Sequence, residues 1–123
     1  MEIKDVKYIV LIPELIDFDR LFKVDPPRYG TGYYGLKSYG NFTALESFQI
    51  DRGENILEHF TLYETKDSAL AAIEKALAFA KWRNKINGFS IETYIEYLNR
   101  LNVFEVEVSY KIKGFRNGKE NEE

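Results

Sequence analysis

The clearest pattern of apolar and polar positions lies between residues 103 and 113. Apolar side chains alternate there with polar ones; the apolar set is Phe104, Val106, Val108, Tyr110 and Ile112, and the polar set is Glu105, Glu107, Ser109, Lys111 and Lys113. Successive side chains of a strand point to opposite faces of a sheet, so the alternation predicts a half-buried antiparallel strand.

Patterns in the rest of the chain predict a mixed order of elements, β-α-β-β-α-α-β. The continuous apolar run at residues 6–12 predicts a strand that is buried on both faces. A turn that contains Arg52 and Gly53 joins two strand-like runs and favours a hairpin over residues 42–50 and 56–64. Helical spacing and capping residues predict three helices, at residues 14–23, 67–86 and 90–101.

The simplest topology with this order is an α+β fold with a ferredoxin-like split βαβ sheet, one inserted helix and helices over one face. Residues 1–116 are expected to form this single domain and residues 117–123 a loose polar tail. In this topology the strand at residues 103–113 lies at the sheet edge, where its backbone can pair with another copy of the chain or with another protein. Its charged side chains are the alternative, because charges at an edge also protect it from such pairing.

Glycines and tyrosines are interleaved between residues 26 and 41, which predicts a long loop. The string from Gly30 to Gly35 matches the G-x-G-x-x-G pattern of dinucleotide sites, but neither the preceding strand nor the following helix is predicted, so we expect no such cofactor. Glycine allows a ligand to approach closely and tyrosine provides rigid contact area, which makes the loop a candidate contact surface. The alternative is a surface loop whose tyrosines cover the core edge. The candidate contact residues are Arg28, Tyr29, Tyr33, Tyr34 and Lys37.

Composition narrows the classes of function. The chain has no cysteine, which excludes disulfides, thiolate catalysis and cysteine-based metal sites and is typical of a reducing, cytoplasmic setting. The formal net charge of −3 disfavours a general nucleic-acid-binding domain, and the apolar runs are shorter than the roughly 20 residues of a membrane helix. Abundant lysine, glutamate and isoleucine with a single glutamine are typical of thermophiles, including archaeal cells or their viruses.

The single histidine, His59, lies in the predicted hairpin with Glu46 and Glu58. A hairpin loop of two or four residues places Glu46 opposite His59, whereas a three-residue loop places Glu46 near Phe60 and Glu58 opposite Phe48. Two carboxylates and an imidazole can hold a divalent cation or transfer protons, which makes these three residues candidate catalytic groups. The alternative is a solvated face of the hairpin, and no metal ligand is assigned because nothing else converges on them.

The helix predicted at residues 67–86 carries Trp82 near its polar side, beside Ala71, Lys75 and Ala78. Three interpretations are open. The helix at residues 90–101 folds back and covers the indole; Trp82 anchors a protein–protein contact; or it stacks on a nucleic-acid strand whose phosphates are neutralised by nearby cations. These cations, which are otherwise a solvated helix face, are Lys75, Lys81, Arg83 and Lys85.

Together these patterns favour a non-enzymatic binding protein without a cofactor, which associates with itself or with another protein. One alternative is a small metal-assisted nuclease or hydrolase that uses Glu46, Glu58 and His59. The other is a nucleic-acid-binding protein that uses the basic end of the helix at residues 68–86.

Overall fold

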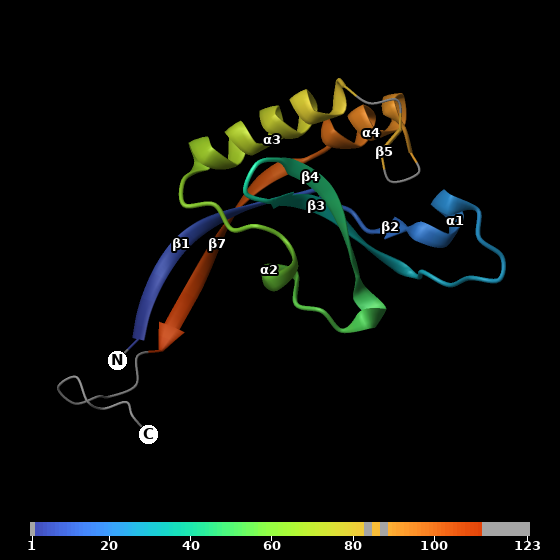
Figure 1. The fold of residues 1–123 in the computed structure, drawn as a ribbon. Coiled ribbons are helices and arrows are strands. Elements are labelled where there is room, and N and C mark those ends of the chain that lie inside the picture. Colours follow the sequence, from blue (N-terminus) through green and yellow to red (C-terminus); the bar gives the residue numbers. More distant parts are fainter. Residues whose placement is uncertain (1, 83–84, 87–88, 112–123) are drawn as a thin grey trace.

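A computed structural model of the chain describes residues 2–82, 85–86 and 89–111 (Figure 1). Within these ranges the strands are β1 (Glu2–Leu11), β2 (Ile16–Asp17), β3 (Thr31–Ser38), β4 (Thr43–Gln49), β5 (Lys85–Ile86), β6 (Phe89–Ser90) and β7 (Asn102–Lys111). The helices are α1 (Phe18–Phe22), α2 (Ile56–His59), α3 (Lys66–Ala80) and α4 (Ile91–Leu98), with a 3-10 turn at Ile50–Arg52. The expected mixed α+β class is confirmed.

Five strands form one antiparallel sheet in the spatial order β4-β3-β1-β7, in which β2 follows β1 along the same edge of β3. This order is not ferredoxin-like, because that topology requires a helix that crosses the sheet and a parallel neighbouring strand. Ile16 pairs with Gly32 instead, so the connection stays beside the sheet and β3 returns antiparallel to β1. The five-residue α1 belongs to this connection and replaces the longer helix expected at residues 14–23.

β3 occupies the middle half of the segment expected to be a loop, residues 31–38 of 26–41. Its glycines are needed because the neighbouring strands approach closely: a Cβ atom at Gly32 would lie 1.9 Å from the carbonyl oxygen of Phe48. One at Gly35 would lie 2.8 Å from the carbonyl oxygen of Val10. The glycine pattern therefore reports strand packing, and the interpretation as a long loop is wrong for residues 31–38.

The sheet packs an apolar cluster against each face. Val10 packs with α3 and α4 on one face, whereas Ile9, the preceding residue, packs with Phe48 and Phe60 on the other. A strand buried on both faces is thus confirmed for the C-terminal half of β1. The expected cover of helices on one face is also confirmed, since α3 and α4 lie together over that face (Figure 1).

Local hydrogen bonds fix the ends and edges of these elements. Thr65 begins α3 through a capping box with Ser68. The N–H of Leu45 in β4 donates to the hydroxyl of Tyr94 in α4 at 2.9 Å, so α4 satisfies a backbone group at the outer edge of β4. No helix in the described part of the chain is long and apolar enough to span a membrane.

The connection from α1 to β3 is held by Asp19. Its carboxylate accepts hydrogen bonds at 2.8 Å from the backbone N–H groups of Tyr29, Arg28 and Gly30. These hydrogen bonds, with that of Tyr29 the strongest influence, lower the pKa of Asp19 from its ordinary value of 3.8.

Residues 56–64 do not form the second strand of the expected hairpin. Asn55 caps the short helix α2, and only Tyr63 bridges to a strand, at Tyr8. β4 pairs with β3 instead, so the hairpin exists but its other strand lies before β4.

Candidate binding surfaces

β1 and β7 form a two-stranded ribbon that extends beyond the rest of the sheet (Figure 1). The two strands pair over ten positions, from Glu2 opposite Lys111 to Leu11 opposite Asn102. The other edge of β1 is paired at Tyr8, which bridges to Tyr63, and at Leu11, which pairs with Gly35 of β3. Among the described residues, no strand pairs with that edge before Tyr8. We call residues 2–7 of β1 and 106–111 of β7 the arm.

β7 is the last strand of the sheet and, among the described residues, pairs with β1 alone. Within the described residues its outer edge therefore presents backbone groups that no other strand pairs. The expected edge position of this strand is confirmed, although the surrounding topology differs and positions 112 and 113 lie outside the described residues.

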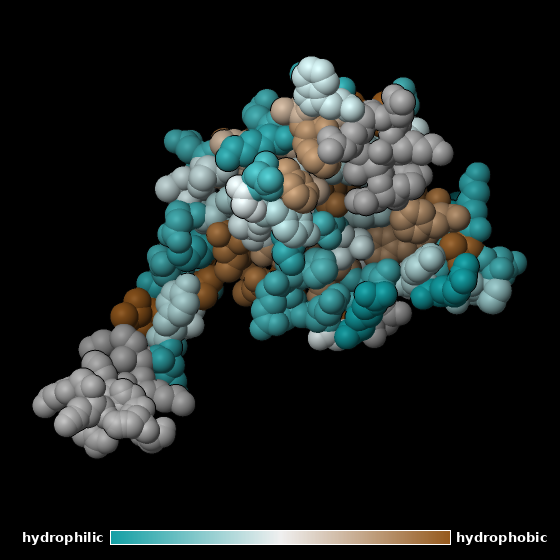
Figure 2. Space-filling model, in the orientation of Figure 1, coloured by the Kyte–Doolittle hydropathy of each residue, from teal (hydrophilic) through white to brown (hydrophobic). Residues whose placement is uncertain are grey.

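The two faces of the arm differ in chemistry. Directly paired residues share a face, so Ile3 lies beside Tyr110 on one face and Val6 beside Glu107 on the other. The first face continues the apolar cluster of Phe48 and Phe60, and it also carries Asp5 opposite Val108 and Lys7 opposite Val106. Its tip is uncovered, since Ile3 is 47% and Tyr110 46% exposed. Figure 2 shows hydrophobic atoms exposed along the arm beside hydrophilic ones.

The alternation of β7 is thus confirmed, but its apolar side lies on the face opposite the helices. Val106 contacts the cluster on that face, and Phe104, opposite Ile9, is still 37% exposed. The strand is less buried than expected because the helices cover the other face of the sheet.

An ion pair fixes the base of the arm. The ammonium group of Lys7 contacts the carboxylates of Glu64 and Asp5. The hydrogen bond with Glu64 is the main reason that the pKa of Lys7 rises above 10.5.

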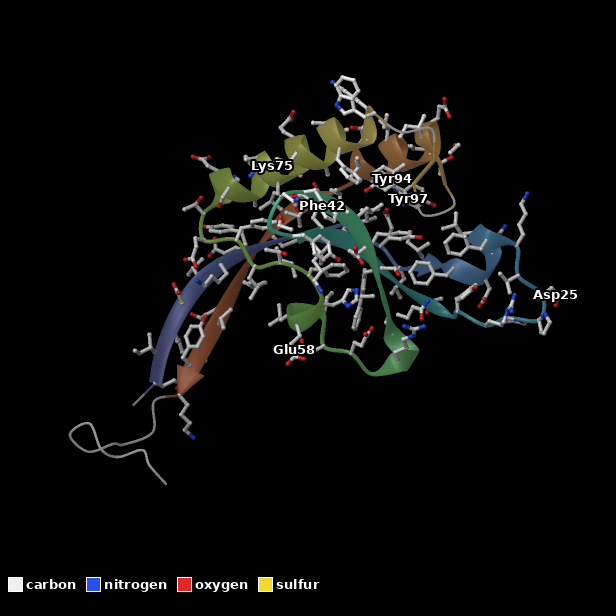
Figure 3. The ribbon with its side chains drawn as sticks, in the orientation of Figure 1. Asp25, Phe42, Glu58, Lys75, Tyr94 and Tyr97 are labelled. Atoms are coloured by element: carbon white, nitrogen blue, oxygen red, sulfur yellow. The ribbon has the colours of Figure 1, made fainter. Side chains whose placement is uncertain are left out.

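A second surface is a pocket of about 480 Å³ between the β3–β4 turn and the C-terminal half of α3. Its lining residues are Ser38, Tyr39, Gly40, Asn41, Phe42, Thr43, Lys75, Ala78, Phe79 and Trp82. The ring of Phe42 stacks on Tyr39 at 4.8 Å and on Phe79 at 5.2 Å between centroids. Figure 3 shows Phe42 below α3, the helix that carries Lys75.

The charges beside this pocket are mostly positive. Lys75 is among its lining residues, and the ammonium group of Lys37 lies 5.8 Å from the Tyr39 ring centroid. The hydroxyl of Tyr39 donates to Glu46 at 2.8 Å, which raises the pKa of Tyr39 to about 12. Lysines beside aromatic rings can hold a planar anionic ligand.

Trp82 is 85% exposed, so α4 does not cover it. That interpretation is wrong because α4 packs on the sheet beside α3, and its buried residues Tyr94 and Leu98 belong to the core that the two helices share. The expected neighbours Lys75 and Ala78 do line the same pocket as Trp82.

The candidate contact residues of the supposed loop are dispersed. Tyr34 is buried in the helix-covered core, 5.2 Å from the ring of Phe18, and burial raises the pKa of its phenol. Tyr33 packs on the opposite face of the sheet. Tyr29 contacts the ring of Phe22 and packs against the same helix-covered core as Tyr34. Tyr33 and Tyr34 are successive residues of a strand and cannot share a face, so the three tyrosines do not form one contact surface.

Two other members of that candidate set lie at separate places. Arg28 lies 5.9 Å above the ring of Tyr29, in the connection that Asp19 holds. Lys37 lies at the far end of β3, beside the pocket.

The candidate catalytic groups make separate contacts. Glu46 accepts the Tyr39 hydroxyl, Glu58 is exposed on α2, and the His59 Nδ1 atom lies 3.9 Å from Glu54. Neither expected register occurs, because β3 takes the place beside β4. In the ranges that the structure describes, no three histidine, aspartate or glutamate side chains are grouped to hold a metal ion.

The basic end of α3 is described in part. Lys81 is exposed directly beside Trp82, at the end of the helix. Lys85 belongs to the short strand β5 and not to α3, which ends at Ala80. Arg83 lies outside the described residues.

The sequence interpretation missed Tyr39, Phe42 and Phe79 as members of a common site. Gly40 and Asn41 form a two-residue turn, closed by a hydrogen bond from the Tyr39 N–H to the Phe42 carbonyl. Gly-Asn is a hairpin turn signal, and it was available in the sequence. The packing of this turn on α3 could not be read from the sequence, because it depends on the tertiary fold.

The chain matches no known protein-family model, no curated protein and no solved structure.

Proposed function

We propose that this protein is a non-enzymatic binding module that associates with protein strands, including those of its own copies, through the arm. The observation that carries the proposal is the outer edge of β7, which pairs with no other strand among the described residues and carries partly exposed apolar side chains on one face. An unpaired edge supplies backbone hydrogen bonds to an added strand, and side-chain contacts on the faces select the partner.

The charges of β7 are consistent with selective pairing. Glu105, Glu107 and Lys111 all lie on one face, so an added strand meets a charged face and an apolar face at once. Charges protect an edge against strands that fail to complement them, and they favour a strand that does.

The test is the molar mass of the protein by size-exclusion chromatography with light scattering over a range of concentrations. We expect the mass to rise above that of the monomer. Val108→Lys should return it to the monomer, because it puts a charge on the edge strand between the apolar side chains of Val106 and Tyr110. Trp82→Ala is the matched control on the other surface and should leave the mass unchanged. A strictly monomeric wild type at high concentration would remove self-association from the proposal.

A second candidate function is the binding of single-stranded nucleic acid at the aromatic pocket. The observation that favours it is the 85% exposure of Trp82 at a pocket that also contains Lys75. Bases stack on exposed aromatic rings while lysines neutralise phosphates.

Because Trp82 is the only tryptophan, its fluorescence reports directly on this site. Titration with a single-stranded oligonucleotide at low salt should quench it, and affinity should fall as salt rises. Lys75→Ala should weaken binding, with Lys4→Ala on the arm as the control. An unchanged emission at low salt would exclude this function.

A further inference from the structure

We infer that a second copy of the chain pairs antiparallel with β7, with Val108 of one copy opposite Val108 of the other. The inference rests on the proposed association through the arm and adds the identity of the partner and the register. The proposal comes from three properties of the arm: its open edge, the division of its faces, and the order of its charges.

Symmetry restricts the arrangement first. A pair of identical strands related by a two-fold axis through the sheet is antiparallel, and each contact occurs twice. Opposed residues share a face, so the apolar faces of both copies become continuous only when one residue lies opposite its own copy. Any other alignment places apolar residues beside charged ones.

Charge selects among the remaining registers. Pairing centred on Glu105 or Glu107 places a glutamate opposite itself, and pairing centred on Val106 places Glu105 opposite Glu107 twice. Like charges directly opposite each other destabilise a sheet. Registers centred on Val103 or Phe104 avoid such pairs but span at most positions 102–106 of the described strand. The register centred on Val108 avoids them over positions 105–111.

This register is also self-complementary. It places Glu105 opposite Lys111 twice on one face, and Val106 opposite Tyr110 twice around Val108 on the other. Centring on Ser109 pairs Glu107 with Lys111, but spans only positions 107–111 of the described strand. The longest charge-matched pairing within the described residues is therefore the one centred on Val108.

The arm leaves room for this partner. In Figure 1 it extends away from α3 and α4, and those helices cover the sheet rather than the outer edge of the arm. The product is one continuous sheet through both copies, with the exposed Tyr110 rings each placed against a valine.

Single-cysteine variants test the register, because the chain has no cysteine of its own. Opposed residues have Cα atoms about 4.5–5.5 Å apart, which a disulfide can span. Val108→Cys should form a covalent dimer under mild oxidation. Val106→Cys is the matched control on the same face: in this register its two thiols are about 13 Å apart, four residues along the strand, and should cross-link at least about tenfold more slowly.

A charge exchange between copies provides an independent test. Glu105→Lys and Lys111→Glu should each weaken self-association about tenfold, because each places like charges opposite one another at two points. An equimolar mixture of the two variants should restore association, since each lysine then meets a glutamate. This rescue needs a partner copy, so a general loss of folding cannot produce it.

The outcomes separate the inference from the proposed function. A wild type that dimerises while Val106→Cys cross-links as fast as Val108→Cys, and whose charge variants do not rescue one another, overturns the register but keeps the arm as a binding surface. A wild type that remains monomeric overturns the second copy as partner. Selective cross-linking of Val108→Cys together with rescue in the mixture supports both.

Discussion

The hydroxyl of Tyr94 has a structural task that its helix position does not reveal. It accepts the buried N–H of Leu45 across 49 positions of sequence. Tyr94→Phe leaves that N–H without this acceptor, and we expect the free energy of unfolding to fall by about 1–3 kcal/mol. Urea denaturation measures the change.

Tyr33→Phe is the control for this experiment. It removes the same atom from a half-buried tyrosine whose hydroxyl has no hydrogen-bond partner in the described part of the chain, and a change within about 0.5 kcal/mol is expected. Equal losses in the two variants would contradict the role assigned to Tyr94.

At the residue scale the sequence predicted which side chains are buried better than it predicted which groups they contact. Helical spacing placed Tyr94 and Leu98 on the apolar face of their helix, where both are buried. The same reasoning could not find the Leu45 N–H, because that contact depends on how α4 meets β4. Trp82 was located correctly beside Lys75, but its exposure depends on where α4 packs.

At the scale of the element, β3 depends on close approach at its glycines. Gly32→Ala would place a Cβ atom 1.9 Å from the Phe48 carbonyl oxygen, so β3 and β4 must separate. We expect a loss of at least about 2 kcal/mol in the free energy of unfolding.

Gly40→Ala tests the same substitution where no atom lies within 4 Å of the added carbon. Its effect should stay within about 0.5 kcal/mol. Thermal or urea unfolding compares the two, and a Gly32→Ala variant as stable as Gly40→Ala would show that glycine is not required in β3.

Elements with a long periodic pattern were predictable, and those chosen by competition between strands were not. The 15-residue α3 and the ten-residue β7 were recognised within a few residues of most of their ends. Residues 31–38 and residues 56–64 could each form the strand that pairs with β4. The sequence pattern favoured residues 56–64. The Gly40-Asn41 turn and the close packing at Gly32 favour residues 31–38, which form β3.

At the scale of the whole molecule, the sheet order was the part that local patterns could not supply. A strand pattern states which side chains alternate, but not which strand lies next to it. Pairing of Ile16 with Gly32 brings β3 beside β1 and removes the expected crossover. The sequence pattern likewise showed which side chains of β7 are apolar. It could not show that they lie on the face of the sheet opposite the helices, because that depends on the order of the strands.

The arm also determines how the molecule would respond to mechanical force. Glu2 and Lys111 lie opposite each other at its tip, so tension between these residues would load one pair at a time instead of shearing the whole ribbon. Six pairs, from Glu2–Lys111 to Lys7–Val106, open before Tyr8 and its bridge to Tyr63 carry the load. Their twelve residues release about 40 Å of chain while the body of the sheet stays intact. The arm is therefore a compliant extension of a stiffer body.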